Sequence, residues 1–242
     1  MEATELGESN AGGDQAGRRS GGAGAVWLRE ESDRPRRAAP LTRERIIDAA
    51  VALLDEHGID GLTMRRLAQH VAVTSTALYW HVKTKDDVLD LAVDQIFGEV
   101  RLPTAGDDWR DDVRALACRW RAVMLRHPWA PSLIGRPLLG PNVLARTEFL
   151  QAALVRGGFT GMELAVATRM VANYVIGAAL TEATWRQSED PEARTEARRH
   201  LAANRAAYPT LIASGHLDDE RWSDDDLFER GLDAILAPVP RT

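Results

Sequence analysis

Apolar and polar positions alternate with a helical period along nearly the whole chain after residue 40. From Thr42, apolar side chains recur three and four residues apart as far as Gly58, and shorter helical patterns follow Thr63 and Thr74. A fourth pattern begins near Thr84 and runs to about residue 100. Prolines and glycines separate further predicted helices at 108–126, 141–156, 160–187, 191–206 and 224–237. Since no stretch shows the sustained alternation of a strand, we predict an all-α fold.

Three segments of the chain differ in character. Residues 1–40 are rich in Gly, Ala, Ser and Glu, so we expect a disordered arm. Its basic cluster, Arg34, Arg36 and Arg37, could reach phosphates or a minor groove, or stay solvated. Residues 41–101 hold short helices joined by a tight turn, which predicts an N-terminal three-helix helix-turn-helix domain. Residues 107–238 predict a larger helical domain.

The composition is that of an ordinary globular protein, 45% hydrophobic and 27% charged. A net charge of −6 argues against a general polyanion binder, so any nucleic-acid surface must be local. Cys118, the single cysteine, excludes a disulfide framework and suits a small core position. The first 30 residues lack the features of a secretory signal, and no run of 18 apolar residues occurs. We therefore predict a cytoplasmic protein without a membrane partner.

Positions 61–85 stand out from this acidic background. They contain no Asp or Glu, and they include the only two lysines, Lys83 and Lys85. A helical period places Leu78 and Val82 on one face and leaves polar and aromatic side chains on the others. The aromatic residues could simply belong to a core. Their lysine neighbours and the missing carboxylates favour a helix that enters the major groove of DNA.

Each exposed side chain expected in this window suits a contact with DNA. Hydroxyl and methyl groups of Thr76 and Ala77 can meet base edges, and the fork of Arg65 matches O6 and N7 of guanine. Hydroxyl, indole and imidazole donors, and the ammonium groups at the next helix start, can bind phosphate oxygens. These donors belong to Tyr79, Trp80, His81, Lys83 and Lys85.

The run LTMRRLAQHVAVTSTALYWHVKTKDDVLD, residues 62–90, resembles the DNA-binding domain of the TetR family of bacterial transcriptional regulators. Its LYWHV-K-K part is typical of the tetracycline-repressor branch. The resemblance implies that Arg65 reads a guanine and that Thr74, Ser75, Thr76 and Ala77 face bases. It implies phosphate contacts for Thr63, Tyr79, Trp80, His81 and Lys85. Ala72 stands where the family usually has Gly, a change that costs conformational energy without altering the fold.

The run GGFTGMELAVATRMVANYVIGAALTEATW, residues 157–185, resembles the long dimerisation helix of the same branch. Its small residues, Ala172 and 177–179, would permit close helix contact, although an ordinary buried helix would also fit. In this family the C-terminal helices also form a ligand cavity. The expected lining residues, each also a plausible core residue, are Trp120, Met124, His127, Trp129, Leu133, Met170, Asn173 and Tyr174. This lining implies a bulky, partly apolar effector.

We predict no metal ion or other cofactor. Tetracycline-binding members place a magnesium-coordinating His after their fifth helix, but the corresponding loop, PWAPSLIGRP, contains none. His81 has no potential ligand at helical spacing. Ser223 and the three aspartates that follow it are typical of a helix start.

Together these features predict a homodimeric repressor that binds a palindromic operator in double-stranded DNA and is released by a small-molecule effector. One alternative is a partner-binding regulator with a degenerate DNA-binding domain. Another is a hydrolase that uses His127 or the acidic residues 218–226. No nucleophile–base pair, phosphate loop or metal spacing supports an enzyme.

Overall fold

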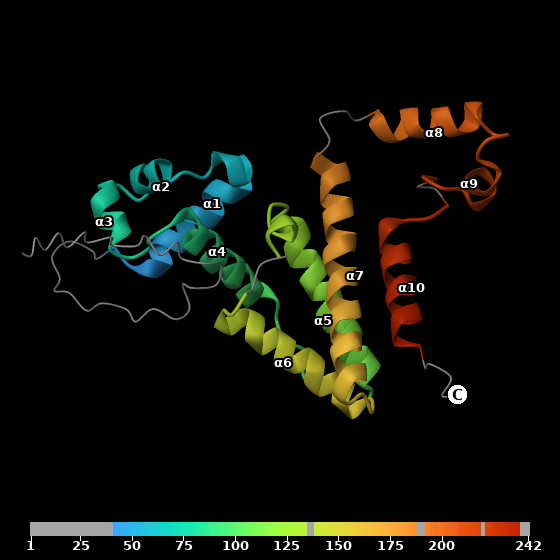
Figure 1. Ribbon diagram of the computed structural model, residues 1–242, viewed down its shortest axis with the longest axis horizontal. Coiled ribbons are helices and arrows are strands. Elements are labelled where there is room, and N and C mark those ends of the chain that lie inside the picture. The colour runs from blue at the N-terminus through green and yellow to red at the C-terminus, as the bar shows by residue number, and fades with distance from the viewer. Residues whose placement is uncertain (1–40, 135–137, 188–191, 219–220, 238–242) are drawn as a thin grey trace, which may run out of the picture.

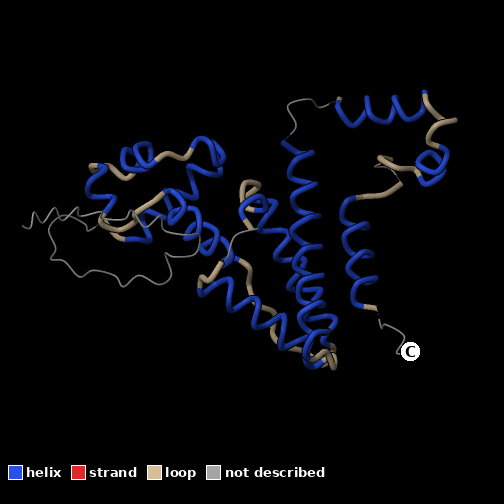
Figure 2. The backbone as a smooth tube through the Cα atoms, in the orientation of Figure 1, coloured by secondary structure: helices blue, strands red, loops and turns tan. Residues whose placement is uncertain are grey.

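The computed structural model describes residues 41–134, 138–187, 192–218 and 221–237. Within these ranges every regular element is a helix (Figures 1 and 2), which confirms the predicted fold class. The basic cluster of the N-terminal arm lies outside the described residues.

Four helices form the N-terminal part, and a threonine side chain caps the start of each. They are α1 (Arg43–Gly61), α2 (Met64–His70), α3 (Ser75–Tyr79) and α4 (Lys85–Glu99). The cap residues are Thr42, Thr63, Thr74 and Thr84, whose hydroxyls accept first-turn N–H groups at the positions where the sequence pattern predicted the helices to begin. Gly58 kinks α1 near its end with a φ of 65°.

The tight turn between α2 and α3 depends on a left-handed residue. Ala72 has a φ of 57°, a conformation that an L-residue with a Cβ adopts at a cost. The turn brings Leu67, Leu78 and Val82 into the core with α1 and α4. This is the predicted helix-turn-helix arrangement, and Ala72 keeps it despite replacing the expected Gly.

The C-terminal part consists of longer helices, labelled in Figure 1. They are α5 (Trp109–Arg126), α6 (Pro141–Arg156), α7 (Gly161–Gln187), α8 (Ala193–Ala203), α9 (Pro209–Ser214) and α10 (Asp224–Leu236). Helix α5 packs against α6 and α7, and α7 also packs against α6 and α10. The sequence pattern does not predict α9, because Pro209 and Gly215 are residue types that usually separate helices. Pro209 instead opens the helix, and Gly215 ends it with a φ of 70°.

Side chains of α4 and α6 bind the unpaired backbone groups at each other's ends. The N-cap residue of α6, Gly140, offers no side chain, and the carboxylate of Asp94 on α4 accepts the N–H of Val143 at 2.9 Å instead. In return, Arg146 on α6 donates to the carbonyls of Gly98 and Val100 at the end of α4, each at 2.9 Å. These groups have no partner within their own helices, so the two helices hold each other in register.

A second joint connects the two parts of the protein around His127. Its Nδ1 lies 2.8 Å from a carboxylate oxygen of Asp55 on α1, and its Nε2 lies 3.2 Å from Glu99 on α4. Trp129 donates its indole N–H to the same oxygen of Asp55 at 2.7 Å. Buried imidazole and indole groups therefore tie the end of α5 to the DNA-binding helices.

Helix α7 is long and apolar, but little of it is buried. An 18-residue window within Gly161–Arg186 has a mean hydropathy of 1.4 with 17% of its residues buried, so by length and composition it could cross a membrane. A search for uninterrupted apolar runs misses it because Arg169 and Glu182 interrupt the sequence. Glu182 is buried in an ion pair with Arg121 of α5 at 2.6 Å, as expected for a helix packed within a protein.

Replacing Ala72 by Gly should stabilise the protein. Glycine reaches the observed φ without steric cost, so we expect a gain of about 1 kcal/mol in the free energy of unfolding. Ala52→Gly is the matched control, because Ala52 is exposed within α1 and should lose about 1 kcal/mol. Urea unfolding measures both; destabilisation by Ala72→Gly would contradict the assigned turn geometry.

Candidate nucleic-acid interface and effector cavity

The surface of α3 carries most of the predicted DNA-binding residues. Thr74, Ser75 and Thr76 are exposed, and Ala77 is half-buried beside them. Tyr79 and Trp80 are 44% and 57% exposed, which rules out the interpretation that they are core aromatics. The α3 surface is thus polar and aromatic outside, with Leu78 buried behind it.

Two predicted DNA-binding threonines already serve as helix caps. The hydroxyl of Thr63 accepts the N–H of Arg66 at 3.1 Å, and that of Thr74 accepts the N–H of Ala77 at 3.2 Å. A hydroxyl that accepts one hydrogen bond still has its own proton to donate. Capping therefore fixes both hydroxyls at helix starts and leaves them able to donate to a phosphate or a base.

The two lysines have different surroundings. Lys83 is exposed, donates to the carbonyl of Tyr79 at 2.7 Å and lies 5.8 Å from the ring centre of Trp80. Lys85 is half-buried and donates to the carbonyl of Ile59 at 2.6 Å, where α1 ends. An ammonium group has three protons, so each lysine keeps donors for a phosphate. Lys85 is positioned more firmly because it bridges two helices.

The remaining two residues of the predicted surface are also accessible. Arg65 is exposed on α2, and its guanidinium makes no hydrogen bond or ion pair with a described residue. His81 is half-buried after α3, close enough to Glu44 at the start of α1 to help lower the pKa of that carboxyl. The main cause of that lowering is the hydrogen bond from the backbone N–H of Glu44.

A cavity of about 420 Å³ lies between α4, α5, α6 and α7. Its apolar walls include Phe97, Trp120, Ile134, Leu138, Leu150 and Ile176. Its polar lining consists of Arg146, Thr147, Gln151, Thr168, Arg169 and Asn173. Mostly apolar walls with a few polar groups are typical of small-molecule sites.

The cavity brings together only two of the eight residues predicted to bind an effector, Trp120 and Asn173. Met124 is fully buried, and Leu133 is buried in a short 3-10 turn, Pro131–Leu133. His127 and Trp129 lie at the joint with Asp55 instead. Met170 is 47% exposed on α7, and the ring of Tyr174 stacks on Phe228 of α10 at 5.4 Å. The prediction rested on a mostly apolar set with a few polar groups, and a set of this kind is equally typical of a packed core, where most of these side chains lie.

Most of the cavity lining was not predicted from the sequence. The missed polar residues, however, follow helical spacing: Arg146, Thr147 and Gln151 on α6, then Thr168 and Arg169 on α7. Polar side chains within otherwise inward-facing apolar stripes were the signal that could have found them.

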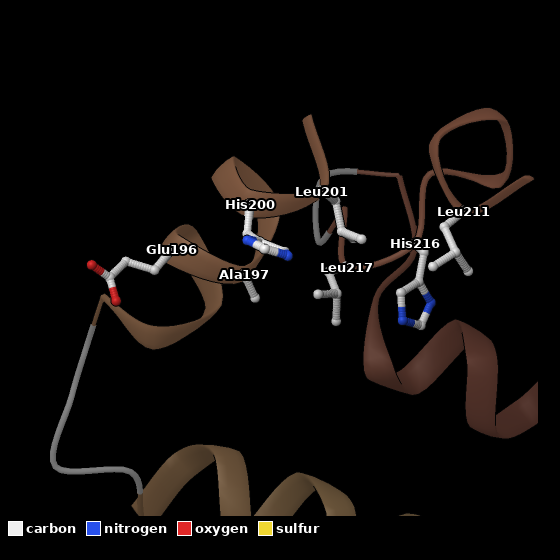
Figure 3. A pocket seen from close by; sticks show the side chains of 7 residues that line it. All are labelled: Glu196, Ala197, His200, Leu201, Leu211, His216 and Leu217. Carbon is white, nitrogen blue, oxygen red and sulfur yellow. The ribbon is translucent and has the colours of Figure 1, made fainter. Parts of the chain in front are cut away.

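A second hollow of about 470 Å³ lies between α8 and the α9 segment, at the edge of the molecule. Figure 3 shows the lining side chains, which are Glu196, Ala197, His200, Leu201, Leu211, His216 and Leu217. None of these lining residues belongs to α4, the helix that connects the two parts of the protein. Among the described residues, no group of three or more His, Cys, Asp or Glu side chains could hold a metal ion, including at the capped start of α10.

The single thiol lies apart from these sites. Cys118 is half-buried on α5, and burial is the main cause that raises the pKa of its thiol. A raised pKa disfavours the reactive thiolate at neutral pH.

Comparisons with known proteins agree with this geometry. The model for bacterial regulatory proteins of the tetR family matches residues 46–92, and that for the tetracyclin repressor-like C-terminal domain matches residues 102–241. An HTH-type transcriptional regulator of Saccharopolyspora erythraea is 45% identical over 224 residues, which are 92% of this chain and 94% of that relative.

Two solved structures are informative neighbours. ActR, a TetR family protein of Streptomyces coelicolor in complex with actinorhodin, has a TM-score of 0.73 at 29% identity, with 82% of this chain and 96% of that chain covered. BioQ with its natural double-stranded DNA operator has a TM-score of 0.54 at 31% identity, with 61% and 91% covered.

The chain is therefore a helix-turn-helix transcriptional regulator. It belongs to the TetR family and combines a DNA-binding domain with a ligand-binding C-terminal domain of the tetracycline-repressor type. This assignment rejects the alternative that the protein is a hydrolase, because the relatives are transcription factors.

Arg65→Ala should reduce specificity rather than general affinity. Loss of a guanidinium that reads one base should cost about 1–3 kcal/mol and relax preference at that position. Lys85→Ala should instead weaken all duplexes alike and reduce the salt slope by about one unit. Competition binding with single-base operator variants measures both effects. A base-specific loss in Lys85→Ala, or a uniform loss in Arg65→Ala, would contradict these roles.

Proposed function

We propose that the protein is a homodimeric repressor whose two α3 helices enter successive major grooves of a palindromic operator. A bulky, partly apolar effector in the cavity between α4, α5, α6 and α7 releases it. As a DNA-binding regulator, it would work in the cytoplasm. The observation that carries this proposal is Arg146, which lines the cavity and also holds the carbonyl end of α4.

The proposed mechanism is a shift between two positions of α4. An effector acts only through its different affinity for the two states. Because α4 packs against both α1 and α6, a change at Arg146 would move the DNA-binding helices of each protomer. Two recognition helices must lie about 34–36 Å apart to read successive grooves, so a change in their separation would weaken binding.

The proposed dimer interface is the exposed apolar stripe of α7. Met162, Val166, Met170, Gly177 and Leu180 recur at helical spacing, and all five are exposed. An exposed apolar patch of this kind is typical of a subunit interface. A close approach of the partner at Gly177 is sterically open, since a Cβ there would meet no atom within 4 Å.

Salt-dependent binding to DNA tests the proposed function against the alternative of a degenerate DNA-binding domain. We expect the protein to prefer a palindrome from the promoter of its own gene over random duplex, with an affinity that falls as salt rises. Fluorescence anisotropy over a salt series measures this. Equal binding to both duplexes would favour the partner-binding alternative, for which the intact exposed face of α3 offers no support.

Met170→Asp should convert the dimer to a monomer. The interface is symmetric, so each substitution occurs twice. Losing the half of each Met side chain that dimerisation buries costs roughly 1.5–3 kcal/mol for the pair, which raises the dimer dissociation constant at least about tenfold, and two buried carboxylates raise it further. Sedimentation measures the change. Leu144→Asp is the control, because Leu144 is 49% exposed on α6, outside the stripe. Equal effects of both variants would contradict an α7 interface.

Arg146→Met should weaken DNA binding from a distance. The variant leaves the carbonyls of Gly98 and Val100 without their partner, which costs about 1–3 kcal/mol of stability. We expect faster hydrogen exchange at the end of α4 and lower operator affinity. Arg156→Met is the matched control on α6, since Arg156 pairs with Asp112 of α5 instead. A similar loss of affinity in both variants would show that stability alone is responsible.

A further inference from the structure

We propose that the effector is an anion, namely an aromatic or similarly apolar molecule whose negative group is bound by Arg169. The inference rests on the proposed function, because it concerns the same cavity. It adds the charge of the ligand and the residue that selects it.

The charged lining of the cavity is entirely basic among the described residues. Arg146 and Arg169 contribute to it, and no described Asp or Glu does. This is unusual in a chain with a net charge of −6. Two positive charges beside apolar walls attract a ligand anion, and any water that the bound ligand displaces makes this attraction stronger.

The guanidinium donors of Arg146 already bind other groups of the protein. Its Nε and Nη2 donate to the carbonyls of Val100 and Gly98, and its Nη1 reaches Asn142 at 3.2 Å. The charge of Asp94 also acts on it, and burial is the main cause that lowers the pKa of this guanidinium. Arg146 therefore positions α4, and its charge is partly balanced.

The surroundings of Arg169 are different. It is an exposed residue of α7, and its guanidinium makes no hydrogen bond or ion pair with any described residue. A planar fork with five donors matches a carboxylate or sulfonate with two parallel hydrogen bonds. Arg169 is thus the cavity group with both free charge and free donors.

The neutral polar groups of the cavity include one buried donor that is unused. The indole N–H of Trp120 is shielded from solvent and has no acceptor among the described residues. Gln151 and Asn173 likewise make no hydrogen bond there. An unmatched buried donor costs about 1–3 kcal/mol. An oxygen acceptor on the ligand would satisfy the indole N–H of Trp120, whereas the amides of Gln151 and Asn173 can each donate or accept.

The apolar walls define the remainder of the molecule. Phe97 and Trp120 meet edge to face with ring centres 5.4 Å apart, and Ile176 and Leu138 complete the wall. Such walls favour a flat, aromatic body. A single ligand could therefore place its anionic group at Arg169 and its aromatic body against Trp120.

Two matched probes separate charge from apolar contact. 1-Anilinonaphthalene-8-sulfonate carries a sulfonate, and N-phenyl-1-naphthylamine has the same aromatic body without it. We expect the wild-type dimer to bind the sulfonate probe about tenfold more tightly, and Arg169→Gln to remove that preference. Arg169→Lys should restore part of it. Arg199→Gln, at an exposed site outside the cavity, should leave it unchanged. Fluorescence titration at two salt concentrations measures all of these.

A cavity-filling variant distinguishes failure of this inference from failure of the proposed function. Ala165 lines the cavity and is exposed, so Ala165→Phe should reduce the binding of both probes. If it does so while Arg169→Gln affects both probes equally, the anion inference is wrong and the effector cavity stands. If Ala165→Phe changes neither probe, the cavity is not the binding site and both proposals fail.

Discussion

The structure depends on the mutual capping of α4 and α6. Asp94 closes the start of α6, and Arg146 closes the end of α4, so neither helix end is satisfied without the other. Asp94 is buried, which strengthens the hydrogen bonds that it accepts relative to water, and Arg146 is half-buried. Burial is the main cause that raises the pKa of Asp94, while its bonds to Val143 and Asn142 favour the ionised form. The register of α4 is therefore fixed from the ligand-binding side.

Helix α4 thereby belongs to both domains. It packs against α1, and its last turn meets His127, which also contacts Asp55. Two polar joints and a continuous apolar core thus link the cavity to α3. This arrangement gives a physical route between the sites, and a two-state shift of α4 needs no other element. In the proposed mechanism the two arginines have different roles: Arg169 selects the ligand, and Arg146 couples ligand binding to the position of α4.

The sequence predicted the DNA-binding half better than the cavity, for physical reasons. Threonine caps and helical spacing are local signals, so the four N-terminal helices and the exposure of Trp80 followed from them. The cavity joins side chains from four helices, and a single helix pattern does not show which stripe faces an opening. His127 and Tyr174 looked like ligand contacts, yet tertiary partners occupy them. Arg146 and Arg169 were overlooked because basic residues on helices are usually solvated.

A hydroxyl-radical footprint on the promoter of the protein's own gene tests the central claim most directly. If two α3 helices read a palindrome, two protected half-sites should appear on one face of the duplex. Their centres should be about 34–36 Å, or one helical turn, apart. The Met170→Asp protein at the same concentration should lose both together. A single isolated footprint, or protection without a preferred sequence, would contradict a dimeric repressor with paired recognition helices.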